Sequence, residues 1–245
     1  MRNLALLLLF GVSTAQAQGL TVFYKQAVGE APPASEVTHD ATTPLSAVEN
    51  GNLSTFDIPS HTVAANDNRV SVVVIGEYSG AGGDSVSTVV RDGQSFTKLG
   101  TYNYDANNKI EMWYLVAPNT GAAVTTVTMT AFNYFEISAG ISTYYNVDQS
   151  TPLTGFVTNT GTGTTASVDV PNTASTDLVV DGVYFYTADA TVDESQDERW
   201  RVFNASFMGS GSSTEAGDGS TVTMSWGLGS SIEWQMIGAR IQVAP

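Results

Sequence analysis

Short apolar stretches alternate with turn-forming residues along most of the chain, and this pattern predicts β-strands. The clearest stretches are residues 70–78 (VSVVVIGEY), 109–117 (KIEMWYLVA) and 177–187 (DLVVDGVYFYT). The first of them is almost continuously apolar and rich in valine, which is typical of a strand that is buried on both faces. After the first 17 residues, no stretch predicts a helix of more than a turn or two.

The strand pattern occurs twice. Residues 70–78, 126–130 and 135–145 of the first half correspond in order and character to residues 177–187, 221–226 and 232–243 of the second half. Strands at spacings of roughly 8–15 residues are typical of a sandwich. We therefore predict an all-β fold: a single, jelly-roll-like β-sandwich that is built from two related halves.

Alternation within the strands predicts which side chains are buried. In residues 126–131, Val127, Met129 and Ala131 share one face, while the intervening threonines suit an exposed pleat. The predicted core comprises Val73, Val127, Met129, Val180, Trp226 and Ile241.

The last strand changes its buried face along its length. Trp234 and Met236 lie on one face, whereas Ile237, Ala239, Ile241 and Val243 lie on the other. Gly238 lies near this switch. We therefore expect a β-bulge or a kink near Gly238.

The N-terminus has the pattern of a secretory signal peptide. Arg2 precedes an apolar run at residues 4–12, and Ala15-Gln16-Ala17 fits a cleavage site. A buried N-terminal helix is the alternative. The predicted organisation is a signal peptide at 1–17, an N-terminal strand and Pro-rich linker at 18–36, and the sandwich domain at 37–245, with at most one or two short strands in residues 37–69.

The stretch after the signal peptide is a candidate for assembly. Leu20, Val22 and Tyr24 lie on one face of a predicted strand, and Pro32-Pro33 separate this strand from the sandwich. A strand on a tether can add to the sheet edge of a neighbouring molecule, and head-to-tail addition of this kind produces a filament. The alternative is that the strand pairs with its own sandwich.

Composition narrows the function classes. The formal net charge is −15, from 24 acidic and nine basic residues, and this charge repels nucleic-acid backbones. The chain contains no cysteine, which excludes disulfides and thiolate metal sites, and its two histidines leave little room for a zinc site.

One acidic loop is a candidate cation site. Calcium binds six to eight oxygen ligands, which often come from loops. The candidate ligands are Asp189, Asp193, Glu194, Asp197 and Glu198. Their spacing is not that of an EF-hand, and the alternative is a solvated acidic loop.

Two carbohydrate functions are alternatives to a structural role. Exposed aromatic side chains could form a stacking platform for sugars, although most of the aromatic residues are needed for the core. Glycoside hydrolysis requires two carboxylates that face each other across a cleft, and Glu111, Glu136 and Glu233 lie on predicted strands. No catalytic serine motif is present.

Several segments resemble a recurrent secreted β-sandwich domain of bacterial and phage surface proteins. These segments are 109–118, 147–153, 177–183, 198–200, 221–226 and 237–239, and the resemblance extends over about residues 65–245. It implies a structural or adhesive module of fibres and surface arrays and carries no catalytic residues with it. We therefore expect a secreted, non-enzymatic structural subunit that needs no cofactor, associates with itself and has no membrane span in the mature chain. Surface carbohydrate is a further partner to consider.

Overall fold

A computed structural model describes residues 36–80, 82, 85–187, 189–206 and 208–245. These residues form fourteen β-strands and no helix, and none of the described residues belongs to a helix that could cross a membrane. The first half contains β1 (Thr38–Pro44), β2 (Glu49–Val63), β3 (Val70–Ser79), β4 (Val86–Arg91), β5 (Gln94–Ser95), β6 (Thr97–Asn103), β7 (Asn108–Val116) and β8 (Gly121–Tyr145). The second half contains β9 (Leu153–Val170), β10 (Leu178–Tyr186), β11 (Ala190–Val192), β12 (Asp197–Phe203), β13 (Met208–Ala216) and β14 (Val222–Ile241).

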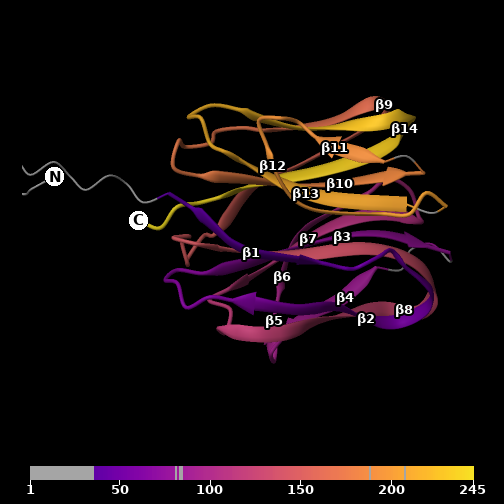
Figure 1. Ribbon diagram of the computed structural model, residues 1–245, viewed down its shortest axis with the longest axis horizontal. Helices are drawn as coiled ribbons and strands as arrows, with labels where there is room; N and C mark the ends of the chain where they lie inside the picture. The colour runs from indigo at the N-terminus through magenta and orange to yellow at the C-terminus, as the bar shows by residue number, and fades with distance from the viewer. Residues whose placement is uncertain (1–35, 81, 83–84, 188, 207) are drawn as a thin grey trace, which may run out of the picture. The chain divides into compact units, whose positions relative to one another are not determined.

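The two halves form two antiparallel sheets that pack on each other, so the predicted β-sandwich is confirmed (Figure 1). All eight strands of the first half belong to one sheet, and all six strands of the second half belong to the other. The sheets therefore divide the sequence at the connection between β8 and β9.

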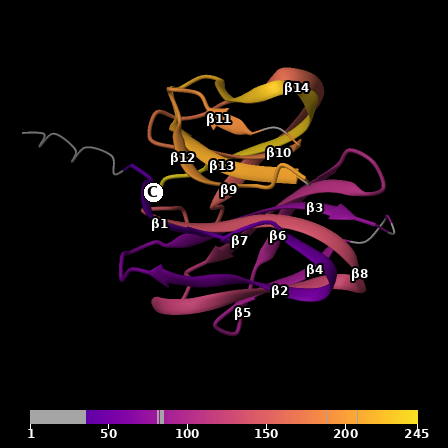
Figure 2. The same ribbon diagram turned by 45° about the vertical axis from the view of Figure 1, so that its right-hand side comes forward.

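The first sheet is nearly a barrel. Its strands follow the order β5-β4-β8-β3-β7-β6, and β1 and β2 pair with the other edge of β8. Only Phe96 separates β5 from β6, and its backbone N–H donates to the Val89 carbonyl of β4 (2.9 Å). The ring closes because β8 is long and curved, so that one of its ends pairs with β4 and the other with β3 (Figure 2).

The second sheet repeats this plan. Its order is β11-β14-β10-β13-β12, with β9 along the other edge of β14. β14 corresponds to β8, since it pairs with the short β11 at one end and with β10 at the other. The strand order confirms the two related halves that the repeated sequence pattern predicts.

Glycine residues bring the sheets into close contact. A Cβ atom on Gly140 of β8 would lie 2.5 Å from the ring of Trp200 in β12, and one on Gly182 of β10 would lie 2.6 Å from Val74 in β3. Neither position has room for a larger residue. The sequence pattern at these positions, small residues within apolar strands, therefore follows from the tight packing of the two layers.

The predicted core is buried. None of its six residues exposes more than 4% of its surface: Val73, Val127, Met129, Val180, Trp226 and Ile241. The prediction that Ala131 shares the buried face of Val127 and Met129 is wrong, because Ala131 is exposed. It lies near the centre of β8, where β2 shifts its register between Leu53 and Thr55, so the alternation does not continue through it.

The predicted face switch in β14 is also confirmed. Trp234 and Met236 belong to a core cluster within the second sheet, whereas Ile237 and Ala239 belong to the core between the sheets. The pairing of β14 with β9 shifts register between Gly238 and Arg240, next to the predicted position. The extra residue lies on β9, between Thr154 and Val157, and β14 itself keeps an unbroken register with β10.

Met129 tests the facing of β8. Its side chain is 4% exposed, so Met129→Ala should remove about 2–5 kcal/mol from the free energy of unfolding. Val124→Ala is the matched control, since Val124 lies on the same strand and is 43% exposed. Thermal melts of the two variants measure the difference, and an unchanged Tm for Met129→Ala would contradict the assigned facing.

One prediction about strands needs correction, and another concerns residues that the structure does not describe. The short strands expected in residues 37–69 are instead β1 and a long β2, because the polar residues of β2 alternate with the buried Phe56, Ile58 and Val63 on a one-sided edge strand. The predicted N-terminal strand and its tether, with Leu20, Val22 and Tyr24, lie outside the described residues.

Candidate functional site

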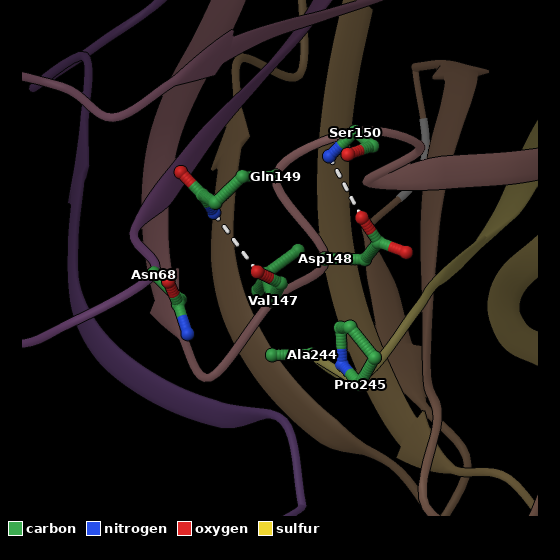
Figure 3. Close-up of a pocket in the computed structure, with 7 residues that line it drawn as sticks. All are labelled: Asn68, Val147, Asp148, Gln149, Ser150, Ala244 and Pro245. Atoms are coloured by element: carbon green, nitrogen blue, oxygen red, sulfur yellow. Dashed lines mark hydrogen bonds between the residues drawn. The ribbon is translucent and has the colours of Figure 1, made fainter.

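A small pocket lies where the β8–β9 connection meets the end of the chain (Figure 3). Its volume is about 250 Å³, and it is lined by Asn68, Val147, Asp148, Gln149, Ser150, Ala244 and Pro245. Gln149 Nε2 donates to the Val147 carbonyl (2.9 Å), and the Ser150 N–H donates to Asp148 Oδ1 (2.7 Å). These polar groups stabilise their own loop, and the lining offers no aromatic ring for a sugar.

The acidic loop is not arranged as a cation site. Asp189 and Glu198 both contact Arg201, and Asp197 forms an ion pair with Arg199 (3.0 Å). The Asp193 carboxylate accepts hydrogen bonds from Ser195, and these bonds lower its pKa. Among the described residues, no three acidic or histidine side chains are placed to hold a metal ion, Glu194 included. Four of the five carboxylates predicted as calcium ligands, those of Asp189, Asp193, Asp197 and Glu198, are therefore directed to arginines or to their own loop.

A second acidic residue, Asp181 of β10, is fully buried among hydrogen-bond donors. Its carboxylate accepts from the Ser213 N–H (2.6 Å), the Ser213 hydroxyl (2.9 Å) and Trp226 Nε1 (2.8 Å), with Gln196 Nε2 at 3.4 Å. Removal from water raises the pKa of Asp181 to about 7, against the effect of these bonds. The network connects β10, β13 and β14 to the turn before β12, which is a structural role.

The first sheet encloses a comparable polar group. Glu111 of β7 accepts a hydrogen bond from Trp113 Nε1 (2.8 Å) and forms an ion pair with Lys98 (2.9 Å). Burial raises the pKa of Glu111, and Lys98 opposes this effect. The neighbouring Glu77 of β3 is also fully buried, 3.8 Å from the Lys109 ammonium.

The carboxylates of the glycosidase alternative do not form a pair. Glu111 is buried inside the first sheet, Glu136 lies on β8 beside the Tyr134 hydroxyl (3.2 Å), and Glu233 lies on β14 in the other sheet. Their surroundings are unrelated, and the buried Glu111 is not accessible to a substrate.

Both histidines lie on the first sheet, His61 in its interior and His39 at a partly exposed position of β1. His61 is fully buried between the hydroxyls of Thr43 (3.1 Å) and Thr143 (2.8 Å), and burial lowers its pKa to about 4. His39 contacts Thr42 and packs edge-on against Tyr144, at 5.6 Å between ring centroids. His61 is therefore neutral at pH 7 and stabilises the seam between β1, β2 and β8.

An aromatic platform for sugars is not visible on the described surface. All four tryptophans are buried: Trp113, Trp200, Trp226 and Trp234. Tyr104 and Phe132 are the large aromatic side chains that stand out among the described residues, 39% and 71% exposed. They lie on separate loops or strands and form no row.

The surface feature that remains is a pair of long sheet edges. Four strands exceed ten residues, and two of them, β8 and β14, pair on both sides. The other two, β2 and β9, pair on one side only within the described part of the chain. Each therefore presents a row of backbone N–H and C=O groups that another strand can pair with.

The strand β9 was missed in the sequence because its apolar content is low. The signal that could have found it is the recurrence of Thr158, Thr160, Thr162 and Thr164 at every second residue, which is the period of a strand. Threonine is favoured on an exposed pleat.

Comparison with known proteins adds no relative: no family model, curated protein or solved structure matches this chain. The resemblance to secreted surface sandwich domains therefore stays a prediction.

Proposed function

We propose that this protein is a secreted, non-enzymatic structural subunit of an extracellular fibre, filament or surface assembly. The observation that carries the proposal is the long edge of β9 that no described strand pairs with, whereas the other long strands of the described sandwich, apart from β2, are paired on both sides. Such an edge is an aggregation hazard unless it is blunted, covered or used. In an assembly it is used, because a strand from a neighbouring subunit pairs with it.

The placement of reactive side chains supports a structural role. Glu111, Asp181 and His61 are the groups best suited to acid–base chemistry, and each has no exposed surface. Their contacts join strands within the sheets instead of facing solvent. Buried polar networks of this kind stabilise one specific arrangement of strands.

The N-terminal sequence supplies the other half of the proposal. A signal peptide at residues 1–17 directs the chain to secretion, and the mature chain then begins with the predicted strand at 18–28. This strand is uncharged except for Lys25, and the linker after it contains Pro32-Pro33. In our proposal it leaves its own subunit and joins the next one.

Deletion of residues 18–28 tests the function. We expect the mature protein to sediment as large species and to appear as fibres in negative-stain microscopy, whereas the deleted protein should be a folded monomer. The physical reason is that the deletion removes the donor strand and leaves the sandwich intact. Circular dichroism and thermal melting measure whether the body is still folded.

Two triple substitutions give a register-specific control. Replacing Leu20, Val22 and Tyr24 by serine removes the face that is proposed to dock, and replacing Thr21, Phe23 and Lys25 removes the opposite face. Only the first should abolish assembly. If the deletion unfolds the body, or if the mature protein stays monomeric at high concentration, the strand belongs to its own domain and the proposed function fails.

A further inference from the structure

We infer that the edge of β9 from Val157 to Gly163 is the acceptor site for residues 18–28 of a second copy of this chain. This inference rests on the proposed function and identifies the surface that performs it. The choice between the two long edges, β9 and β2, follows from the direction of their backbone groups and from their side chains.

The hydrogen bonds of β14 determine which backbone groups of β9 face outward. The Gln242 N–H donates to the Pro152 carbonyl (2.9 Å), so Gln242 points toward β9. Directions alternate along a strand, and β14 keeps an unbroken register with β10 from Trp234 to Ile241. From Gln242 back to Trp234, the backbone N–H and C=O groups of the even-numbered residues of β14 therefore point toward β9.

The register of the two strands transfers this alternation to β9. Trp234 and Met236 are opposite Gly161 and Asn159, so these two residues of β9 point toward β14. Thr158, Thr160 and Thr162 must then direct their N–H and C=O groups away from the sheet. The Thr160 N–H agrees with this assignment, because it donates to the side-chain oxygen of Asn159 (2.9 Å) and not to β14.

The side chains of β9 leave this edge open to another strand. Natural edges are commonly blocked by charged residues or proline. β2 carries three such residues, Glu49, Asp57 and Pro59, whereas residues 153–163 contain none. Asn159 is the one side chain that caps the edge, and its bonds to Thr160 and Ser167 (2.7 Å) would be exchanged for pairing with the donor.

The donor stretch is long enough for the acceptor. A bulge in β9 between Thr154 and Val157 interrupts the edge, so its regular part begins at Val157, and the eleven residues 18–28 can pair along all of residues 157–163. On the acceptor, Gly161 is already covered by the ring of Trp234, since an added Cβ atom would lie 2.7 Å from it, whereas Gly163 has no atom nearer than 3.9 Å. An apolar or aromatic residue on a neighbouring strand can cover Gly163. Leu20, Val22 and Tyr24 alternate as this face requires, and Lys25 is attracted to a chain with a net charge of −15.

The linker favours a neighbouring subunit over the same one. The body begins at Glu36, whose carbonyl accepts a hydrogen bond from Asn146 Nδ2 (3.2 Å), and Val37 N–H contacts the Thr176 carbonyl (3.4 Å). The preceding residues include Pro32-Pro33, which favour an extended backbone and oppose an immediate reversal. A linker of this composition would carry residues 18–28 away from the body and toward another molecule.

A proline on the acceptor edge is the decisive variant. Thr158→Pro removes one outward N–H without removing a bond to β14, and edge strands tolerate proline at such positions. We expect the full mature protein with Thr158→Pro to lose fibre formation in sedimentation and microscopy, with an unchanged far-UV spectrum.

The same substitution on β2 is the matched control. The Thr130 N–H donates to the Ser85 carbonyl next to β4 (2.9 Å), so Thr128 also points toward β4, and Thr55, opposite Thr128, directs its N–H away from the sheet. Thr55→Pro should assemble as the unmodified protein does. Assembly that is lost in Thr55→Pro and kept in Thr158→Pro would place the acceptor on β2 and overturn the inference.

Mixing two defective subunits separates a blocked edge from a misfolded one. Val22→Pro disables the donor and leaves β9 intact, whereas Thr158→Pro disables β9 and leaves the donor intact. Each alone should be monomeric, and an equimolar mixture should form a 1:1 dimer that does not grow further. If the unmodified protein forms fibres but the mixture stays monomeric, or if Thr158→Pro alone still polymerises, the acceptor assignment is wrong while the proposed function stands. If the unmodified protein is itself monomeric, both fail.

Discussion

Gly140→Val is expected to destabilise the protein by about 3 kcal/mol or more, which is a fall in Tm of about 10 °C for a chain of this size. The first added carbon would lie 2.5 Å from the indole ring of Trp200, which is buried between the sheets. Trp200 cannot move without separating β8 from β12. Thermal melting and urea denaturation measure the loss.

Two further variants test the reason for this loss. Gly163→Val is the control, since the nearest atom to its added carbon is 3.9 Å away, and it should change Tm little. Trp200→Leu combined with Gly140→Val should be less destabilised than the sum of the two single variants, because the smaller side chain makes room for valine. Strict additivity would show that the clash with Trp200 is not the cause.

Asp181→Asn is expected to change how stability depends on pH. The pKa of Asp181 is raised from 3.8 to about 7 by burial, so the folded protein holds a proton that the unfolded chain releases between these values. The stability that Asp181 contributes is therefore complete below about pH 4 and is lost as pH rises to 7, by about 4 kcal/mol in all. Asparagine does not titrate in this range. Its amide group would face the same hydrogen-bond donors, Ser213, Trp226 and Gln196, from which the Asp181 carboxylate accepts.

The difference between the two proteins isolates this effect. The lowered pKa of His61, about 4 against 6.5, has the opposite sign, because its neutral form is favoured in the fold and stability rises with pH over that range. Urea denaturation at pH 4.5 and 7.5 should show Asp181→Asn far less stable than the original protein at the lower pH and closer to it at the higher. Asp169→Asn, at an exposed position of β9, serves as the control. A stability gap that does not vary with pH would contradict the raised pKa.

The sequence predicted the fold well where one side of a strand is apolar. Alternation alone identified the buried Val127 and Met129, and the change of alternation around Gly238 indicated the irregular pairing there, although the extra residue lies on β9 and not on β14. These features are local, because the period of a strand determines which face a residue occupies. The apolar segments that recur in the same order in both halves of the sequence likewise predicted the two related halves.

The polar interior could not be predicted in this way. Asp181 looks like an exposed residue in a strand, and its partners Gln196, Ser213 and Trp226 are distant from it in the sequence. Nothing local indicates that they meet. Glu111 was considered as an accessible acid for the same reason, although Trp113 and Lys98 enclose it.

The candidate sites show the same limit. The acidic loop was selected because its carboxylates are close in sequence, but Arg199 and Arg201, on the adjoining strand, pair with three of them. The free edge of β9 is a property of the sheet and not of its residues, so no local pattern could reveal it. The threonine period indicates a strand, and only the topology shows that this strand has one partner among the described strands.

The division of the sequence between the sheets has a consequence for folding during synthesis. In each half the strand that pairs with most of the others comes last: β8 is bound by β1, β2, β3 and β4, and β14 by β9, β10 and β11. Neither sheet is complete until its final strand has left the ribosome, so the earlier strands have part of their apolar faces uncovered until then. Because no pairing within a sheet crosses from one half to the other, the first sheet can close before the second is made. The growing chain thus needs protection twice, once before β8 emerges and once before β14.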